Sequence, residues 1–260
     1  MKLFWTIING LFLSLILHAQ DVQIRWATNP AYPPYDWSLE GKTYQGAAAK
    51  LIQRLSLPGV RFVAVVMPWR RAQEMARKGQ IDMLVNIRET PERDQWLIFA
   101  QHATFPNPIV IFMRQKDKLP PSWSWNDLIP LQGGQAAGDS FGTPFDTFLK
   151  HNLQMQTAPT LVQNFRKLQL GRIDFYVTGL YLGESWLTST HHQGDVAVLT
   201  PPVSQQAITL AFSQLSPHLN LLKAIDHQLE ELGQSGVLKT LLEQSMVEAK
   251  SLNFSSLSEQ

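Results

Sequence analysis

The sequence predicts a two-lobed α/β protein, and three observations favour that fold class. Apolar strands alternate with amphipathic helices along most of the 260 residues, as in a parallel sheet covered by helices. The motif Gly-Gln-Ile-Asp at residues 79–82 recurs as Gly-Arg-Ile-Asp at residues 171–174, each time between a helix and a buried strand. Thr-Pro pairs at residues 90–91 and 143–144 are matching helix starts. The simplest explanation of these repeated motifs is a pair of lobes that share the same local design and face each other.

The composition excludes several classes of site and partner. The formal net charge is +1 and falls to 0 when Lys2 is removed with an N-terminal signal, so no excess charge attracts nucleic acid or anionic membrane. The lack of cysteine excludes disulfides, thiol catalysis and a lipid-modified cysteine. The seven histidines include no pair at His-x-x-x-His spacing, and the sequence has no phosphate-binding glycine-rich loop. We therefore expect no metal, no cofactor and no nucleic-acid partner.

Residues 1–19 have the pattern of an export signal. Lys2 supplies the basic start, residues 3–17 form an apolar run, and Leu17-His18-Ala19 is a passable cleavage site. An uncleaved membrane anchor is the alternative, but the run is short for a span and a globular pattern follows at once. We expect cleavage after Ala19, a mature protein outside the cytoplasmic membrane, and no second transmembrane segment.

The first half of the chain fits this fold element by element. Residues 22–28 alternate as a first strand, and the prolines of residues 29–37 force a rigid loop that carries Tyr32, Tyr35 and Trp37. The remaining elements expected here are a helix over 47–57, a strand over 60–66, a helix ending at Gly79, a strand over 81–85, a helix from Thr90 and a strand over 109–113.

The second half begins after a composition change at residues 115–121, which predict a solvated loop. Residues 132–142 are rich in glycine and make a poor strand, whereas Thr143-Pro144 starts a helix with Asp146 at the capping position N3. The further elements expected are helices over 123–128 and 161–170, strands over 173–177, 196–199 and 207–212, and helices over 219–232 and 237–242. The tail, residues 247–260, is polar and expected to be disordered.

Arg93 is the residue whose position a purely structural role explains least well. It falls in the first turn of the helix expected from Thr90, where a cation opposes the helix dipole. Either the side chain is solvated or it reaches an anion beside the helix N-terminus, and we favour the anion. Arg88, on the preceding loop, fits a surface role and an anion-binding role equally well. Tyr32 and Trp69 lie beside prolines near strand ends and could be packing residues or the apolar walls of a ligand cleft.

Three further polar residues have structural interpretations. Asp82 and Asp174 each follow a glycine turn, where a carboxylate accepts hydrogen bonds from the turn backbone. Residues 138–142 match the Gly-x-Ser-x-Gly pattern of a nucleophile, but that motif needs a strand running into Ser140 and a helix directly after it. The weak strand and the later helix start argue against this chemistry. We expect Ser140 to donate its hydroxyl or N–H to a ligand from a glycine-rich loop.

Several motifs are spread along the chain: the segment 24–35, Gly79-x-x-Asp82, Thr90-Pro-Glu-Arg93, Gly142-Thr143, Gly171-Arg-Ile-Asp174 and a closing Ser-Gly-Val-Leu at 235–238. Together they resemble the periplasmic solute-binding proteins of family 3, the polar amino-acid type that serves ABC importers, over about residues 22–246. The resemblance implies a type II periplasmic binding protein fold, with two hinge crossings and a cleft that closes on a ligand. The boundaries it implies are lobe 1 over 20–112 and 206–246, lobe 2 over 113–205, and crossings near Ile111–Arg114 and Val203–Ala207.

The resemblance also implies roles for individual residues. Arg93 takes the place of the arginine that grips an α-carboxylate, and Tyr32 and Trp69 take the places of residues that flank the ligand. Asn86 and Arg88 occupy the segment that binds the same carboxylate, and a threonine of the second lobe assists with its hydroxyl. The full set of candidate ligand-binding residues is Tyr32, Trp69, Asn86, Arg88, Arg93, Ser140 and Thr143.

Three positions depart from the family pattern. Gly179 stands where an acid receives the α-ammonium of an amino acid, Asn29 stands at a second acidic position, and Arg88 replaces a small hydroxyl residue. A buried ammonium without a carboxylate is costly, so a standard zwitterionic amino acid is in doubt as the ligand. Glu184, about one turn further on, is a possible substitute acid.

Three functions are open on these grounds. The first is a monomeric periplasmic binding protein, not an enzyme, that captures a small carboxylate- or anion-bearing solute for an ABC permease or a membrane sensor. The second is a dehydratase-like enzyme on the same fold with Glu184 as general acid, although no independent catalytic pair supports it. The third is a purely sensory protein, which would dock to a separate output domain because the sequence shows no kinase or cyclase.

Overall fold

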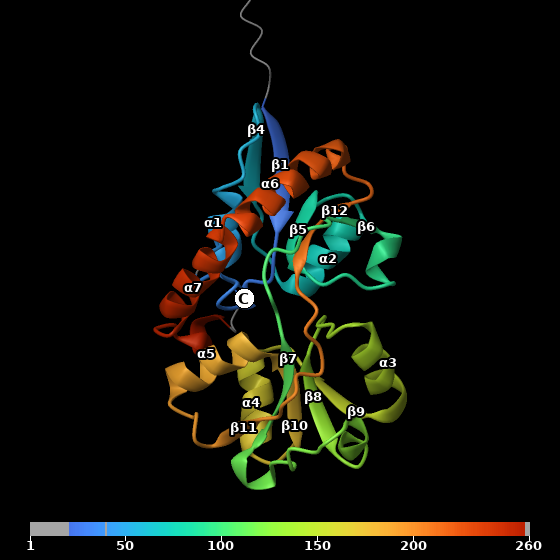
Figure 1. Cartoon of the computed structure of the whole chain (residues 1–260), viewed down its shortest axis with the longest axis vertical. Helices are drawn as coiled ribbons and strands as arrows, with labels where there is room; N and C mark the ends of the chain where they lie inside the picture. Colours follow the sequence, from blue (N-terminus) through green and yellow to red (C-terminus); the bar gives the residue numbers. More distant parts are fainter. Residues whose placement is uncertain (1–20, 40, 258–260) are drawn as a thin grey trace, which may run out of the picture.

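The computed structural model describes residues 21–39 and 41–257, so the expected signal segment 1–19 lies outside the described residues. The chain forms two α/β lobes, one above the other in Figure 1, and each lobe is built on a five-stranded sheet. Both sheets contain parallel and antiparallel strand pairs. The predicted two-lobed α/β architecture is therefore confirmed.

The sheet of lobe 1 has the strand order β4-β1-β5-β12-β6. Its strands are β1 (Val22–Ala27), β4 (Val60–Ala64), β5 (Met83–Ile87), β6 (Leu97–Phe99) and β12 (Thr209–Ser213). The first three pair in parallel, whereas β12 returns from late in the chain and lies antiparallel between β5 and β6. Between β1 and β4, a hairpin pairs β2 (Ala31–Tyr32) with β3 (Asp36–Trp37).

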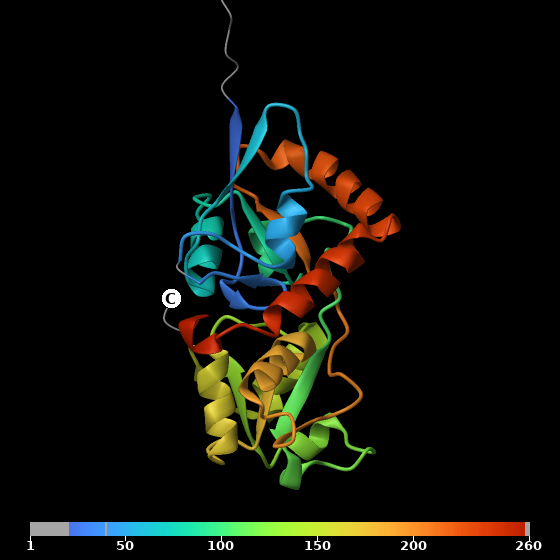
Figure 2. The same cartoon turned by 90° about the vertical axis from the view of Figure 1, so that its left-hand side faces the viewer.

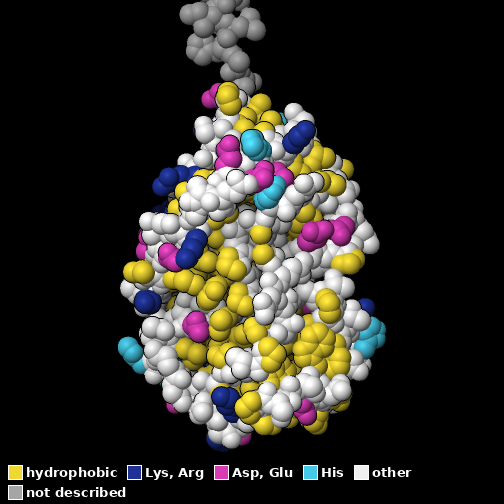
Figure 3. All heavy atoms as spheres, viewed as in Figure 1, with side chains coloured by type: hydrophobic (Ala, Val, Ile, Leu, Met, Phe, Trp, Pro, Cys, Tyr) yellow, Lys and Arg dark blue, Asp and Glu magenta, His cyan; other side chains and the backbone are white. Residues whose placement is uncertain are grey.

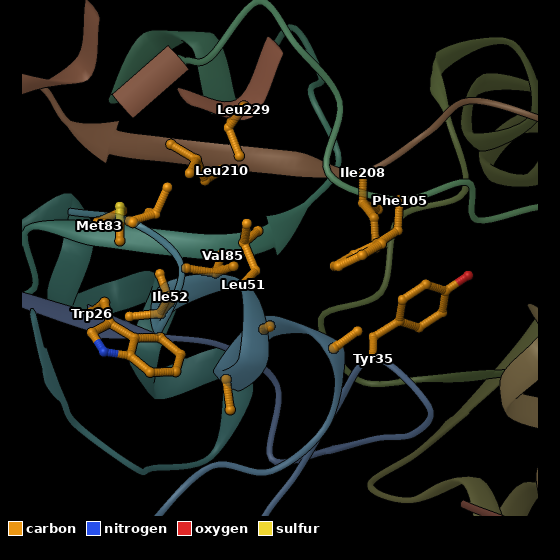
Figure 4. Packing of buried hydrophobic residues seen from close by; sticks show 14 of the residues in the cluster. Trp26, Tyr35, Leu51, Ile52, Met83, Val85, Phe105, Ile208, Leu210 and Leu229 are labelled. Carbon is orange, nitrogen blue, oxygen red and sulfur yellow. The ribbon is translucent and has the colours of Figure 1, made fainter. Parts of the chain in front are cut away.

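Helices cover both faces of this sheet. They are α1 (Ala47–Ile52), α2 (Trp69–Arg77), α6 (Leu222–Gln234) and α7 (Val237–Ala249). On one face, Met83, Val85 and Leu210 belong to the same buried cluster as Leu51 of α1 and Leu229 of α6 (Figure 4). The small apolar residues of α2 pack against the other face. Burial of each such aliphatic side chain contributes about 1.5–3 kcal/mol, so the strand ends that approach lobe 2 are held by a rigid core.

The sheet of lobe 2 has the strand order β11-β7-β10-β8-β9. Its strands are β7 (Ile109–Arg114), β8 (Gln132–Ala136), β9 (Gln154–Ala158), β10 (Phe175–Gly179) and β11 (Val196–Val198). Its helices are α3 (Thr143–Asn152), α4 (Leu161–Gln169) and α5 (Leu180–Thr190).

The sequence analysis did not predict β8, β9 or α5. In β8, Gly133 and Gly134 argued against a strand, yet both glycines are buried in its middle. A Cβ atom at Gly133 would collide with the Met155 sulfur and the Phe175 ring, and one at Gly134 would lie 2.5 Å from Ile173 Cδ1. The glycines are therefore explained by close packing against the neighbouring strands, which their own low strand preference does not reveal.

Two of the expected helices are single 3-10 turns, η1 (Arg93–Gln95) and η3 (Trp125–Leu128). Another 3-10 turn, η4 (Leu219–Leu221), begins the helix expected over 219–232, which continues as α6. The turns η2 (Gln115–Asp117) and η5 (Phe254–Leu257) lie where no helix was expected. The helix predicted from Thr90 is thus wrong, because only η1 forms there. The prediction of a disordered tail is wrong for the described part: α7 continues to Ala249, and Phe254 and Leu257 of η5 are buried.

Two chain segments cross between the lobes side by side. They run antiparallel, with isolated bridges between Phe105 and Ile208 and between Ile109 and Ser204. The first crossing precedes β7, which lies wholly in the sheet of lobe 2, so its predicted position at Ile111–Arg114 is too late. For the same reason residues 109–112 belong with lobe 2. The second crossing leads from β11 to β12 and includes the expected segment Val203–Ala207 (Figure 1).

The repeated aspartates join neighbouring strands. Asp82 Oδ2 accepts hydrogen bonds from the backbone N–H and the Nε of Arg25, at 2.9 and 3.0 Å, and so ties β5 to β1. Asp174 Oδ2 accepts from the Gln132 N–H at 2.9 Å and ties β10 to β8. The predicted bonds to the turn backbone are thus corrected: each carboxylate accepts a backbone N–H of the neighbouring parallel strand, within β1 for Asp82 and at the start of β8 for Asp174. Both lobes contain this hydrogen bond from an aspartate to the neighbouring strand, which supports the internal repeat inferred from the sequence.

The surface carries mixed charge, as the near-zero net charge predicts. On the face shown in Figure 3, acidic and basic side chains are interspersed with uncharged ones. Among the residues the structure describes, no helix has the length and hydropathy needed to cross a membrane.

Candidate functional site

A small polar cavity lies between the lobes, close to both crossings. It is lined by Asn29, Tyr32, Asp36, Trp69, Asn86, Ile87, Arg88, Arg93, Asn107, Asp139, Ser140 and Ile208. Its volume of about 40 Å³ has room for only a few water molecules. A wider groove of about 1160 Å³ opens beside it between α2 and the β8–α3 loop, and Arg93, Asp139 and Ser140 line both spaces. The cavity faces the ends of β1 and β5, where open α/β sheets bind ligands.

Arg93 is buried, with 7% of its surface exposed, and reaches from lobe 1 to lobe 2. Its Nη1 donates to the Arg88 carbonyl at 2.8 Å. Its Nη2 donates to Gln73 Oε1 at 3.1 Å and, across the cleft, to the Gly138 carbonyl at 3.4 Å. Burial lowers the pKa of Arg93 to about 10, against the attraction of Asp139, so the guanidinium stays charged at neutral pH. The predicted inward position of this arginine is seen, although the turn that carries it is 3-10.

Arg88 is more deeply buried, at 3% exposed, which rules out the surface role. Its two terminal nitrogens donate to the carbonyls of Gln206 and Asn107, one on each crossing. Its Nε has no hydrogen-bond partner among the described residues, and burial lowers its pKa. Arg88 therefore ties the two crossings together and leaves one donor in the wall of the site.

Neither Arg88 nor Arg93 forms an ion pair with a carboxylate among the residues described. Buried charges in proteins are normally paired, because an unpaired ion keeps most of its desolvation cost. The site therefore holds two cationic groups whose hydrogen bonds go to neutral acceptors, while Asp139 and Asp146 attract both from beyond ion-pair distance.

Tyr32 crosses the cleft and touches Gly179 at the end of β10. A Cβ atom at Gly179 would lie 2.5 Å from Tyr32 Oη and 2.9 Å from Asn107 Oδ1. Asn107 Nδ2 donates weakly to the same phenol oxygen at 3.5 Å, and burial raises the pKa of Tyr32 far above its usual value. A neutral phenol thus occupies the space that an acidic side chain at position 179 would need.

Asn86 and Asp36 form a buried polar pair, and Asp36 is a site residue that the sequence analysis missed. Asn86 Nδ2 donates to both carboxylate oxygens of Asp36, at 3.1 and 3.0 Å, and its Oδ1 accepts from Thr104 at 2.8 Å. The backbone of Asn86 has φ of 57°, a conformation that asparagine tolerates better than most residues. Burial raises the pKa of Asp36 well above its usual value. The available signal was an acidic residue inside a rigid aromatic loop.

The second-lobe residues are arranged differently from the prediction. Ser140 Oγ donates to Asp146 Oδ2 at 2.5 Å, so its hydroxyl proton is used within the loop. Asp146 also accepts from the N–H groups of Phe141 and Gly142, which is the expected capping role, but the N-cap is Gly142 rather than Thr143. Thr143 is exposed and lines only the wider groove.

Asp139 is the second residue that the sequence analysis missed. Its half-buried side chain lines the cavity and the groove. Burial raises its pKa to about 7, against the opposing effect of Arg93 and Arg88. The Gly-Asp-Ser-Phe-Gly pattern directed attention to the serine, whereas its neighbour is the acid that faces the cavity.

Two other expectations concern acids and metals. Glu184, the suggested substitute acid, is exposed on α5 and lines neither the cavity nor the groove. Within the described part of the chain, no group of His, Cys, Asp and Glu side chains is suited to hold a metal ion.

Two lobes, two crossing segments and a polar cavity between them define the class of two-lobed solute-binding proteins with the type II fold. A family model, that of the bacterial extracellular solute-binding proteins of family 3, matches residues 24–248. The chain belongs to this family, whose members are extracellular binding proteins and not enzymes. The resemblance inferred from the sequence is thereby confirmed.

Solved structures share the fold at low sequence identity. An amino-acid ABC transporter substrate-binding protein from Streptococcus pneumoniae, AbpA bound to L-arginine, has a TM-score of 0.72 at 19% identity, covering 89% of this chain and 97% of its own. A structure from a study of glutathione import by GshT and the cystine importer TcyBC of Streptococcus mutans has a TM-score of 0.74 at 15% identity, covering 91% and 99%. A histidine kinase sensor domain has a TM-score of 0.73 at 17% identity, covering 86% and 96%. Comparison with curated protein sequences gave no match.

Proposed function

We propose that this protein captures a small solute with a carboxylate or other anionic group between its lobes, and closes on it. The observation that carries the proposal is the presence of two buried guanidinium groups, on Arg88 and Arg93, without a carboxylate partner among the described residues. An anion placed against them would form charge-assisted hydrogen bonds and recover the desolvation cost of both.

Closure is explained by contacts that form only when the lobes meet. Arg93 belongs to lobe 1, yet one of its acceptors is the Gly138 carbonyl of lobe 2. An anion held by Arg93 would therefore also lie against the β8–α3 loop, and contacts of this kind favour the closed state over the open one. The cavity of about 40 Å³ is too small for an amino acid, so the lobes must separate to admit the solute. The adjoining groove is the natural route of entry.

The downstream partner is proposed to be an ABC permease or a membrane sensor, reached outside the cytoplasmic membrane in the periplasm. The extracellular character of the family supports this location. The fold is shared with the binding protein of an amino-acid ABC transporter and with a histidine kinase sensor domain, which is consistent with either partner.

A thermal-shift screen tests the anion requirement. The chain from residue 20 is heated with L-amino acids, carboxylates without an amine, and amines without a carboxylate. A ligand at a hundred times its Kd stabilises the native state by about 2.7 kcal/mol, a shift of several degrees in Tm. We expect shifts only from anion-bearing compounds, lost in Arg93→Gln and kept in Arg61→Gln, which alters an exposed arginine of β4. A full shift in Arg93→Gln would overturn the proposal.

A further inference from the structure

The strand β5 contains a β-bulge near its end. In the ladder with β12, Leu84 pairs with Ala211. Three residues further along β5, Ile87 pairs with Thr209, which is only two residues from Ala211, so β5 holds one extra residue in this interval. Within the interval, Asn86 has a left-handed backbone, with φ of 57°. Bulges are common beside functional sites, because the extra residue redirects the side chains that follow it.

The packing of β5 shows what this bulge does. Met83 and Val85 pack on one face of the sheet, and Leu84 packs on the other. Regular alternation would place Ile87 with Met83 and Val85, yet Ile87 belongs to the cluster of Leu84. The extra residue therefore reverses the alternation, as a shift of one residue must. It turns Arg88, the next residue, to the face where residues of both crossings join the buried cluster (Figure 4).

The side chain of Asn86 is held from two directions. Its Nδ2 donates to both carboxylate oxygens of Asp36, at 3.1 and 3.0 Å, and its Oδ1 accepts from Thr104 at 2.8 Å. Asp36 lies on β3 and is 1% exposed. A left-handed backbone is unfavourable for residues other than glycine, and these bonds offset that cost at Asn86. Because a buried carboxylate is itself costly, its place against one neutral amide indicates a role in the site.

We propose that Asp36 is a positioning residue: through Asn86 it fixes the bulge in β5, and the bulge places the guanidinium of Arg88 between the two crossings. There Arg88 donates to the carbonyls of Gln206 and Asn107, and its Nε lines the wall of the cavity with no partner among the described residues. The inference rests on the proposed function, in which that Nε donates to the anion. Asp36 acts on the anion only through the position of Arg88.

Nuclear magnetic resonance of the protein with isotope-labelled arginine tests this role without any ligand. The Nε of Arg88 is buried, so we expect its N–H to exchange slowly with solvent in the wild type. The signal is identified by its absence from Arg88→Lys. In Asp36→Asn an amide nitrogen faces Asn86 Nδ2 whichever way the new amide is turned, because both carboxylate oxygens contact that one atom. We expect exchange about tenfold to a hundredfold faster, the range for one unsatisfied buried hydrogen bond.

Asp82→Asn is the matched control for a general weakening of the strand. Asp82 is also 1% exposed and lies directly before β5, at the opposite end from the bulge. Its carboxylate bonds to Arg25 of β1, so the substitution weakens the same strand without altering the contacts of Asn86. We expect the exchange of the Arg88 N–H to stay close to the wild-type rate. The Tm of each variant verifies folding.

Two substitutions of Asn86 test the bulge without altering Asp36. Glycine adopts a left-handed backbone without strain, whereas alanine does not. We therefore expect Asn86→Gly to keep the slow exchange of the Arg88 N–H and Asn86→Ala to lose it. In the Asn86→Gly background, Asp36→Asn should have no further effect, because the amide through which Asp36 acts is absent.

The outcomes separate this inference from the proposed function. A wild-type Arg88 N–H that exchanges rapidly, an unchanged rate in Asp36→Asn, or an equal acceleration in Asp82→Asn would overturn the role of Asp36. So would equal rates in Asn86→Gly and Asn86→Ala, or a full effect of Asp36→Asn in the Asn86→Gly background. None of these measurements involves an anion. A full thermal shift in Arg93→Gln would contradict the anion proposal and leave the exchange rates as they are.

Discussion

The glycine at position 179 changes the shape of the site, because it leaves room for the hydroxyl of Tyr32. The hydroxyl of Tyr32 occupies the space beside Gly179, where any Cβ atom would lie 2.5 Å from it. We expect Gly179→Ala to cost about 1–3 kcal/mol, as overpacking usually does, and to weaken closure because the contact joins the two lobes. In Tyr32→Phe the oxygen is absent, so adding Gly179→Ala should cost less than it does in the wild type.

Chemical denaturation of the four proteins in this double-mutant cycle measures the coupling, which we expect to be about 1 kcal/mol or more. Additive effects of the two substitutions would show that Tyr32 does not occupy the space of a side chain at position 179. From the sequence alone, Gly179 indicated only that an acid was missing. The tyrosine that fills its place comes from a distant part of the chain, and only the folded arrangement brings the two residues together.

At the level of elements, the packing of β8 gives the sharpest prediction. Gly133→Ala would drive a methyl group into the Met155 sulfur and the Phe175 ring. We expect a loss of about 1–3 kcal/mol and a drop in Tm of roughly 3–10 °C, measured by calorimetry. Gly194→Ala is the matched control, because a Cβ atom there meets nothing within 4 Å. Equal Tm values for the two variants would contradict the packing explanation.

The elements that sequence reasoning found are those whose own residues encode them. β1 alternates between apolar and polar residues, β5 is a continuous apolar run, and α4 carries an apolar face. The capping carboxylate Asp146 is local in sequence. The elements it missed depend on distant partners: β8 is a strand because of what packs against its glycines. The turn at Arg93 was read as a helix from a Thr-Pro start, yet the chain leaves the helical conformation after η1 to form β6. Arg93 is buried at the cleft, but the helix-dipole argument that singled it out does not apply to a 3-10 turn.

Across the whole molecule, the C-terminal segment is a third connection between the lobes, besides the two crossings. α7 belongs to lobe 1, where Lys50 Nζ of α1 donates to Ser245 at 2.9 Å. The following η5 contributes Phe254 and Leu257, 5% and 4% exposed, to the apolar cluster around α4 and α5 of lobe 2. In Figure 2 this segment lies at the junction of the lobes. Because Trp37 of lobe 1 is part of the same cluster, opening the cleft must disturb this contact.

Replacing both η5 side chains should therefore shift the molecule toward its open state. In Phe254→Ser/Leu257→Ser, the loss of two buried side chains removes roughly 3 kcal/mol or more from the closed form, a factor of about a hundred in the ratio of open to closed. We expect a larger radius of gyration in small-angle X-ray scattering of the ligand-free protein, and weaker ligand binding. The exposed substitution Val247→Ser on α7 should change neither quantity. A radius of gyration equal to that of the wild type would mean that η5 follows one lobe without restraining the other, leaving the two crossings to set the range of motion.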